Sequence, residues 1–315
     1  MRQKNVVVIG GGTGTYTVLS GLKYFPVHLS AIVSMADDGG STKLLREEFG
    51  ILPPGSVRPA MIALSHTEKA LADLFSFRFS EGSLKGHNVG NLLITALTRH
   101  LGSFEKAIEE AGKILHIKGE VIPSTLQPCW LFAQLENGRI VKGETNIDIP
   151  KHNGELKIAD VWLDPPCKAN PKALEAIHRA DLIVIGPGDL FSSILPNFLV
   201  KGIAEKIKKS KAKKTYVCNV MTKFGETTGY SASDFITMIE RFIGKNTLRY
   251  VLLNKGRPSR ERIQKYEKEK SEIVSLSPQQ LKGAHYAVIE GNFLRSRGLI
   301  RHDPMKLASA LFSLL

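Results

Sequence analysis

Short apolar runs alternate along the chain with amphipathic segments. The runs predict strands buried on both faces, at residues 5–9, 29–35, 181–185, 215–220, 249–253 and 286–289. The amphipathic segments predict helices at residues 15–24, 41–49, 57–65, 68–77, 89–101, 104–115, 172–179, 197–208, 231–243 and 304–315. This alternation predicts an α/β fold, a Rossmann-like, doubly wound and mainly parallel sheet with helices on both faces.

Residues 119–165 interrupt the alternation of strands and helices. They alternate polar with apolar positions and carry turn signals at Asn137-Gly138 and Asn153-Gly154. The first signal lies between two strand-like segments, 130–135 and 140–141, and indicates a hairpin. We expect residues 119–165 to form a small antiparallel β insertion or edge extension within a single domain that covers residues 1–315.

The composition narrows the class of protein. No segment approaches the roughly 18 continuous apolar residues of a membrane span, and the apolar run near the N-terminus is too short for a signal peptide. The cysteines Cys129, Cys167 and Cys218 are odd in number and scattered, which favours reduced thiols. We therefore expect a cytoplasmic protein without a membrane partner and without a tightly bound cofactor.

The net charge of +13 raises the question of a nucleic-acid partner. Much of the excess lies in residues 201–214, where seven lysines face a single glutamate. Since no aromatic residues interleave with these lysines, nucleic acid is not expected there. A solvated helix face and long-range attraction of an anionic ligand both stay open.

Glycine-rich or polar turns follow several of the predicted strands, where open α/β sheets bind their ligands. After the first strand stands Gly10-Gly11-Gly12-Thr13-Gly14, which suits a phosphate because glycines permit a close backbone approach at a helix N-terminus. The turn is neither a complete dinucleotide fingerprint nor a Walker loop. Gly186-Pro187-Gly188 follows a later strand and is a second phosphate-loop candidate.

Three further turns carry polar side chains. Asp37 and Asp38 follow the second strand and could bind a ribose hydroxyl, hold Mg²⁺ or act as a base. The segment Gly86-His87-Asn88-Val89-Gly90-Asn91 opens a helix, so we include Asn88, Gly90 and Asn91 among the candidate ligand-binding residues. Asn219 opens the segment at the end of another strand.

Taken in order, these segments resemble the gluconeogenesis factor (YvcK) family, within the wider group of 2-phospho-L-lactate transferase (CofD)-like proteins. The residues that carry the resemblance are GGGTGT (10–15), ADDGGS (36–41), LPPGSVR (52–58), GHNVGNLL (86–93), IGPGDLFSSILPN (185–197) and NVMTKFGETTGYSASD (219–234). Asp189 stands where the family commonly has serine. Because a carboxylate beside a phosphate is repulsive, we expect its side chain to point away from a ligand.

The resemblance implies a Rossmann-like core that binds UDP-N-acetylglucosamine and a regulatory role in carbon metabolism, cell-wall synthesis and cell shape. In this interpretation Asp38 and Asn219 bind sugar hydroxyls, Asn254 reads the base, Arg301 pairs with a phosphate and Tyr266 stacks on a sugar. The backbone groups expected at the phosphates and the pocket border are Gly11, Gly12, Thr13, Gly14, Gly186 and Gly188.

Two other functions stay open. One is a transferase of the 2-phospho-L-lactate type, which uses a guanosine nucleotide-linked donor and has Asp37 or Asp38 as Mg²⁺ ligand or base. The other is an NAD-binding oxidoreductase, which the incomplete fingerprint disfavours. The sequence also leaves open a homo-oligomer, a regulatory protein partner and whether any reaction is catalysed, although we favour a binding protein without turnover.

Overall fold

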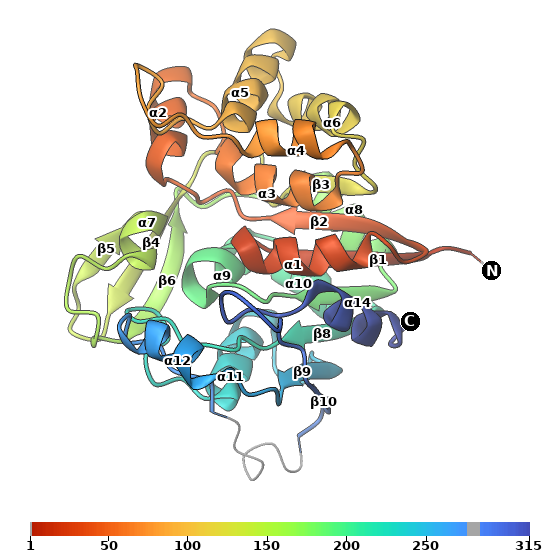
Figure 1. Ribbon diagram of the computed structural model, residues 1–315, viewed down its shortest axis with the longest axis vertical. Helices are drawn as coiled ribbons and strands as arrows, with labels where there is room; N and C mark the ends of the chain where they lie inside the picture. The colour runs from red at the N-terminus through yellow and green to blue at the C-terminus, as the bar shows by residue number, and fades with distance from the viewer. Residues whose placement is uncertain (1, 276–283) are drawn as a thin grey trace.

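The computed structural model describes residues 2–275 and 284–315. In this part of the chain the centre is a seven-stranded sheet of order β10-β9-β8-β7-β1-β2-β3, in which every neighbouring pair is parallel. Helices cover both faces of this sheet (Figure 1), which confirms the predicted doubly wound α/β fold. Its strands are β1 (Lys4–Gly10), β2 (Val27–Val33), β3 (Glu120–Pro123), β7 (Leu182–Ile185), β8 (Lys213–Val217), β9 (Tyr250–Asn254) and β10 (Ala287–Gly291).

The strand order reverses between β1 and β7. From β1 the chain builds the sheet outward through β2 and β3, and it then returns to β7 on the other side of β1 and continues through β8, β9 and β10. The carboxyl ends of β1 and β7 are direct neighbours, with Ile9 opposite Ile185. Loops that leave such a switch point diverge and open a crevice, which is where sheets of this type bind ligands.

The strict side-chain alternation of β1 divides the core in two. Val6 and Val8 face one layer, formed by α1, α3, α5, α6 and α14, and Val7 and Ile9 face the other, formed by α8, α9, α10 and α11. All four side chains are at most 1% exposed. A strand buried on both faces reads as a continuous apolar run, as the sequence pattern predicted.

In the described residues, the helices lie between the strands and after β10. They are α1 (Gly12–Leu22), α2 (Gly40–Phe49), α3 (Pro54–Leu64), α4 (Lys69–Ser76), α5 (Val89–Leu101), α6 (Phe104–Ile114), α7 (Glu144–Asp148), α8 (Pro171–Arg179), the π-helix η1 (Leu190–Ile194), α9 (Leu195–Leu199), α10 (Ile203–Lys209), α11 (Ala232–Ile243), α12 (Arg260–Glu267) and α14 (Pro304–Phe312).

The small antiparallel sheet is present, but with a shorter span than residues 119–165. It consists of β4 (Trp130–Leu135), β5 (Ile140–Lys142) and β6 (Ile158–Asp164), in the order β5-β4-β6. The hairpin at Asn137-Gly138 joins β4 to β5, and Gly138 has a φ of +84°, which suits glycine. Residues 120–123 belong instead to the main sheet, where β3 pairs in parallel with β2.

The predicted elements differ from the structure at three helical segments, one of which is helix α7 inside the segment predicted as a β insertion. The helix expected at residues 197–208 is divided into α9 and α10, and Gly202 between them has a φ of +105°. Helix α12 lies in a mixed-charge segment in which no helix was expected, and it has no buried residue. A helix without a buried face has no apolar residues at helical spacing, so the sequence pattern does not indicate it. None of the helices in the described residues has the length and apolar character needed to cross a bilayer.

Candidate functional site

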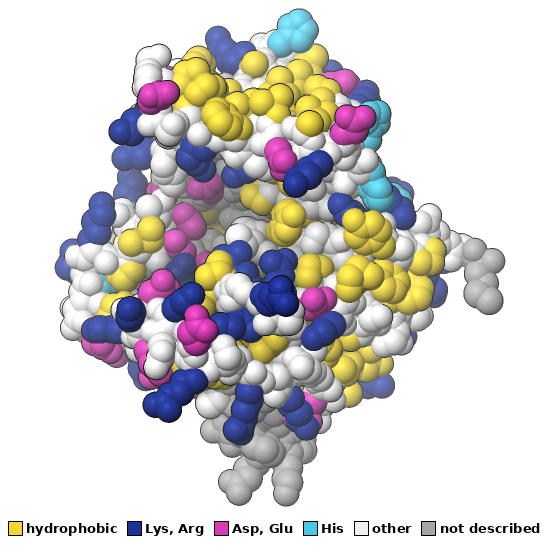
Figure 2. Space-filling model, viewed as in Figure 1, with side chains coloured by type: hydrophobic (Ala, Val, Ile, Leu, Met, Phe, Trp, Pro, Cys, Tyr) yellow, Lys and Arg dark blue, Asp and Glu magenta, His cyan; other side chains and the backbone are white. Residues whose placement is uncertain are grey.

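Five parts of the chain surround a pocket of about 270 Å³ at the switch point. Residues 11–14 and 17 come from the turn after β1 and from α1, and residues 187–189 come from the turn after β7. The remaining walls are residues 219–223 after β8, residues in and after α12, and the segment before α14. We call this the glycine-turn pocket, and Figure 2 shows that the corresponding face of the molecule is hollowed.

The N-terminus of α1 opens into the glycine-turn pocket. The helix begins at Gly12, and its N-cap residue Gly11 has no side chain that could accept a hydrogen bond from the first-turn N–H groups. The first turn contains no acidic residue. Free N–H groups and the positive end of the helix dipole make this position suitable for a phosphate.

The glycines of this turn differ in backbone conformation and in what an added Cβ would contact. Gly12 has a φ of +59°, a left-handed conformation that glycine adopts without strain. A Cβ on Gly14 would lie 2.0 Å from the carbonyl oxygen of Pro187, so this glycine lets α1 approach the loop after β7. A Cβ on Gly11 would meet Ser193 only at an ordinary 3.4 Å.

Asn219 is held with its oxygen directed away from its protein partner. Its Nδ2 donates to the carbonyl oxygen of Gly188 at 2.8 Å, which fixes the orientation of the amide. Its Oδ1 is buried and has no hydrogen-bond partner among the described residues. Because a carboxamide oxygen only accepts, a ligand at this atom has to offer a donor such as a hydroxyl.

The pocket lining also contains Tyr266, Arg301 and His302. The hydroxyl of Tyr266 accepts a hydrogen bond from the N–H of Ile300 at 3.1 Å, which joins α12 to the segment before α14. Arg301 is exposed and His302 is buried. Arg301 therefore adds a cationic side chain to the pocket lining.

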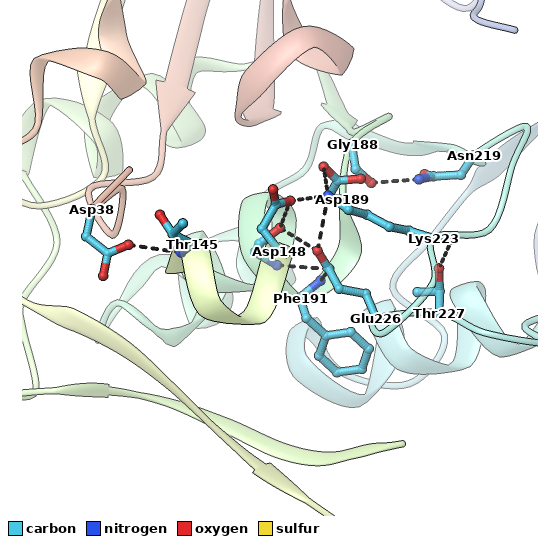
Figure 3. A network of polar contacts seen from close by, with 11 residues as sticks. Asp38, Thr145, Asp148, Gly188, Asp189, Phe191, Asn219, Lys223, Glu226 and Thr227 are labelled. Carbon is cyan, nitrogen blue, oxygen red and sulfur yellow. Dashed lines mark hydrogen bonds and ion pairs between the residues drawn. The ribbon is translucent and has the colours of Figure 1, made fainter. Parts of the chain in front are cut away.

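Lys223 lies at the pocket wall among three carboxylates, as Figure 3 shows. Its Nζ pairs with Asp148 of α7, with Asp189 at 3.0 Å and with Glu226 at 3.7 Å. Although burial alone would lower the pKa of Lys223, these carboxylates raise it, so the ammonium stays charged. The pair with Lys223 also shows how Asp189 is accommodated at the pocket wall, since the ammonium offsets its charge.

Glu226 is the buried member of this cluster, with a side chain that is 0% exposed. Its carboxylate accepts hydrogen bonds from the N–H groups of Phe191 at 2.9 Å and Ser192 at 3.2 Å, and from the Ser192 hydroxyl at 2.8 Å. Burial raises the pKa of Glu226 to about 7 and Asp189 adds to the rise, whereas Lys223 opposes it. Glu226 thus ties the turn after β8 to the loop after β7, which shapes the glycine-turn pocket.

A second hollow of about 110 Å³ adjoins the first at Gly11, Gly12 and Ser193. We call it the acidic pocket, because Asp37 and Glu144 line it. Asp37 accepts hydrogen bonds from the N–H of Gly39 at 2.9 Å and from the Thr42 hydroxyl at 3.2 Å, and burial raises its pKa. Burial first, and then the charges of neighbouring carboxylates, raise the pKa of Glu144 to about 9.

Replacing Glu144 by glutamine is expected to flatten the dependence of stability on pH. The folded state keeps a proton on Glu144 up to about pH 9, whereas the unfolded chain releases it near the ordinary pKa of 4.5. Stability therefore falls as pH rises through this window, and each tenfold difference in proton affinity between the two states is worth about 1.4 kcal/mol. Urea unfolding at pH 4.5 and pH 8 should show the variant gaining stability over the wild type only at the higher pH. The exposed Glu81→Gln is the control, and equal pH slopes for wild type and Glu144→Gln would contradict the expectation.

The structure brings eight of the predicted ligand-binding residues to the glycine-turn pocket and leaves six outside its lining. Those that line it are Gly11, Gly12, Thr13, Gly14, Gly188, Asn219, Tyr266 and Arg301. Gly186 lies in the loop after β7 next to them, whereas Asp38 accepts a hydrogen bond from the N–H of Thr145 at 2.9 Å. Their roles in binding a ligand stay predictions.

The other polar candidates have partners within the fold. Asn88 caps α5 by accepting from the N–H of Asn91 at 3.2 Å, and Asn91 accepts from Arg58 Nε at 3.0 Å. Gly90 packs against Phe75, where a Cβ would approach ring and backbone atoms to 2.6 Å. Asn254 accepts from the N–H groups of Gly256 and Phe293 and so shapes the turn after β9.

Lys223, Glu226, Glu144 and His302 were not among the predicted site residues. Lys223 and Glu226 stand in a polar turn after a strand, which was a usable signal, but their partner Asp148 is 75 positions before Lys223. A larger pocket of about 540 Å³ is lined by residues of α6 and β3, with Lys172 of α8, rather than by the strand-end loops. Its lining does not include the residues that the sequence singled out.

The chain is similar to known proteins over nearly its whole length. The family model described as 2-phospho-L-lactate transferase CofD matches residues 6–294. A gluconeogenesis factor of Halalkalibacterium halodurans is 44% identical, over 99% of this chain and 96% of that protein, and one of Bacillus subtilis is 41% identical over 100% and 99%. An X-ray crystal structure of a Bacillus halodurans protein matches with a TM-score of 0.94 at 44% identity, covering 99% of this chain and 100% of the other.

The doubly wound sheet, its glycine-rich switch point and the family match define the chain as a CofD-like α/β protein. Within that class, the identities over nearly the whole length show that it belongs to the gluconeogenesis factor family.

Proposed function

We propose that the chain is a nucleotide-sugar-binding regulatory protein whose ligand is UDP-N-acetylglucosamine. Its ligand state would report on the supply of cell-wall precursors and so link carbon metabolism to cell-wall synthesis and cell shape. The proposed ligand and the proposed regulatory role both imply a cytoplasmic protein.

One observation carries this proposal: the glycine-turn pocket combines the chemistry that a nucleoside diphosphate sugar requires. The N-terminus of α1 supplies N–H donors for phosphate, and Arg301 adds a positive charge. Asn219 Oδ1 offers a buried acceptor for a hydroxyl, and the ring of Tyr266 offers an apolar surface to a sugar or base. A phosphate ion alone would use only the α1 N-terminus and Arg301.

A ligand screen tests the proposal directly. Thermal unfolding is followed with UDP-N-acetylglucosamine, GDP and NAD, each with and without Mg²⁺. A ligand at 100 times its dissociation constant stabilises the folded state by about 2.7 kcal/mol, which is easily resolved. We expect UDP-N-acetylglucosamine to give the largest shift without Mg²⁺, and an absent shift would refute the proposal.

Replacing Arg301 by glutamine is expected to weaken binding of UDP-N-acetylglucosamine about tenfold or more, because a hydrogen bond to a charged group is worth about 1.5–3 kcal/mol. Isothermal titration measures the change. Arg297→Gln is the matched control, since Arg297 is also exposed, lies four positions earlier and does not line the glycine-turn pocket. Equal affinities for the two variants would remove Arg301 from the site.

The acidic pocket favours a second candidate, a Mg²⁺-dependent transferase of the 2-phospho-L-lactate type. Asp37 and Glu144 lie beside the glycine turn, and burial together with neighbouring carboxylates raises the pKa of both. Carboxylate oxygens are ligands that Mg²⁺ prefers, so these residues fit a divalent cation. Such an ion would offset the charge of a phosphate-bearing donor.

Mg²⁺ and turnover distinguish the two candidates. Under the transferase function, Mg²⁺ should stabilise the wild type but not Glu144→Gln, and a phospholactyl acceptor should be consumed in the presence of a guanosine nucleotide-linked donor. Under the regulatory function, the sugar nucleotide should bind to both proteins without Mg²⁺ and remain intact. Detectable transfer by the wild type would decide for the enzyme.

A further inference from the structure

The cavity of about 540 Å³ beside α6 and β3 lies at the free edge of the main sheet. β3 is the last strand on this side and pairs with β2, and Figure 1 shows α6 and α8 near it. We call this cavity the edge pocket. It is lined by one face of α6, by β3 with the turn before it, and by Lys172 of α8. Its volume is in the range of cavities that bind small molecules.

One face of α6 forms a largely apolar wall of the edge pocket. The lining positions 105, 108, 109, 112 and 113 recur at helical spacing, so they share one face of the helix. Ile108 supplies apolar surface from this face, and Ile117 supplies more from the turn before β3. A Cβ on Gly112 would approach the Ile117 side chain to 2.9 Å, so this glycine leaves room between the two.

The two lysines of the lining already have carboxylate partners. Lys172 Nζ pairs with Glu105 at 3.1 Å and with Glu109 at 2.5 Å, which links α8 to α6. Lys113 Nζ pairs with Glu110 at 2.6 Å. Because these cations are neutralised within the fold, the edge pocket suits an uncharged ligand better than a phosphate.

The backbone of Val121 offers the edge pocket a hydrogen-bond donor and an acceptor. Alternate residues of a parallel strand direct their N–H and C=O groups to opposite sides. The N–H of Ser124 donates to the carbonyl of Val33 in β2 at 2.9 Å, so by steps of two Ile122 also faces β2, whereas Val121 faces the free edge. Val121 lines the edge pocket and is only 6% exposed, and no hydrogen bond from the described residues outside the sheet ladder satisfies its N–H or C=O. Nearly buried backbone groups without partners call for a ligand or water.

The short edge favours a compact ligand over an added peptide strand. Strand addition uses the outward groups of several alternate residues in a row. The next outward residue after Val121 is Pro123, which has no N–H, and the one before it is Gly119, whose φ of +109° departs from a strand conformation. Val121 is therefore left as the outward residue of β3 that presents both groups.

We propose that the edge pocket binds an uncharged small molecule through a cyclic-amide or nucleobase-type edge, which accepts from the Val121 N–H and donates to the Val121 C=O. Both groups of one strand residue point the same way, so a neighbouring donor and acceptor on the ligand satisfy them together. Ile108 and Ile117 supply apolar surface for the rest of the ligand. The edge pocket shares no lining residue with the glycine-turn pocket, so this proposal does not depend on the proposed function.

Two matched probes test the proposal on the full chain by NMR. 2-Pyridone carries the required donor and acceptor side by side, and N-methyl-2-pyridone lacks the donor. We expect 2-pyridone to shift the backbone amides of Gly112 and Gly119, which line the edge pocket. N-methyl-2-pyridone should bind at least about tenfold more weakly, since one hydrogen bond is worth about a factor of ten. Equal affinities for the two probes, or unshifted amides at both glycines, would overturn the proposal.

Val121→Pro tests the assigned contact, because it removes the outward N–H and leaves the bonds to β2 in place. This variant should bind 2-pyridone about tenfold more weakly than the wild type. Val121→Ala keeps the N–H and is the control, with an expected loss of less than about threefold. A folded Val121→Pro variant with wild-type affinity would refute the contact.

Two other outcomes are also decisive. If Val121→Pro does not fold, the comparison of the two probes on the wild type decides. A capped tetrapeptide of alternating threonine and valine serves as a probe for strand addition. If it shifts the amides of Gly112 and Gly119 at lower concentration than 2-pyridone does, the edge of β3 accepts a peptide strand, and the small-molecule proposal fails.

Discussion

Substituting alanine for Gly14 is expected to destabilise the folded protein by at least about 3 kcal/mol, because overpacking against atoms that cannot move is costly. The new Cβ would lie 2.0 Å from the carbonyl oxygen of Pro187, 2.5 Å from its carbonyl carbon and 2.9 Å from the nitrogen of Gly188. All three are backbone atoms of the loop after β7, so no flexible side chain can yield. Either α1 or this loop has to shift, and both line the glycine-turn pocket.

Two neighbouring glycines serve as matched controls. Gly11 has an extended backbone with a φ of −169°, and an added Cβ would make an ordinary contact at 3.4 Å, so Gly11→Ala should cost little. An added Cβ on Gly12 would meet only the Ser193 hydroxyl, at an ordinary 3.8 Å, but the φ of Gly12 is +59°, so Gly12→Ala should cost about 1–2 kcal/mol through backbone strain. Chemical unfolding of the three variants should therefore rank them Gly14, Gly12 and Gly11. A Gly14→Ala variant as stable as Gly11→Ala would contradict this account.

The arrangement of the glycine loops could be predicted because it follows from topology. Strands buried on both faces are continuous apolar runs, and a doubly wound sheet collects the loops at their carboxyl ends on one edge. The turns at Gly11 and Gly188 therefore meet once β1 and β7 are neighbours. That Gly14 serves close packing could not be predicted, since a glycine that approaches a phosphate and one that approaches a carbonyl look the same in a sequence.

The polar candidates show a second limit of the sequence. Asn88 caps a helix and Asn254 shapes a turn. In a sequence, an asparagine with such a structural role looks the same as an asparagine that binds a ligand. Only the pairing of each donor and acceptor separates the two uses. Asn219 differs from them because its Oδ1 stays without a partner among the described residues.

The ion cluster around Lys223 shows the third limit. Its carboxylates come from α7, from the loop after β7 and from the same turn as Lys223 itself. Helix α7 lies in the segment that was predicted as a β insertion, and the sequence carries no signal that this segment returns to the switch point. Long-range electrostatic pairs of this kind become visible only when the fold is known.

Replacing Lys223 by methionine is expected to destabilise the protein by up to about 3 kcal/mol at pH 8. That figure is the lower end of the cost of breaking a buried ion pair, and it is an upper bound here because only Glu226 of the cluster is fully buried. The substitution keeps much of the aliphatic volume but removes the charge that Asp148, Asp189 and the fully buried Glu226 share. Because Glu226 already has a pKa raised to about 7, it can take up a proton when the ammonium is lost. The destabilisation should therefore be much smaller at pH 5 than at pH 8.

Matched variants separate the effect of this partly buried cluster from the effect of removing any surface charge. Lys209→Met removes the same group from a pair with Glu205, in which both side chains are strongly exposed, and should have little effect on stability. Adding Glu226→Gln to Lys223→Met should recover part of the lost stability, since the amide keeps an acceptor for the Phe191 N–H without the charge. Urea unfolding at both pH values measures all of these variants. A Lys223→Met cost that equals that of Lys209→Met, or that does not change with pH, would show that the carboxylates around Lys223 do not depend on it.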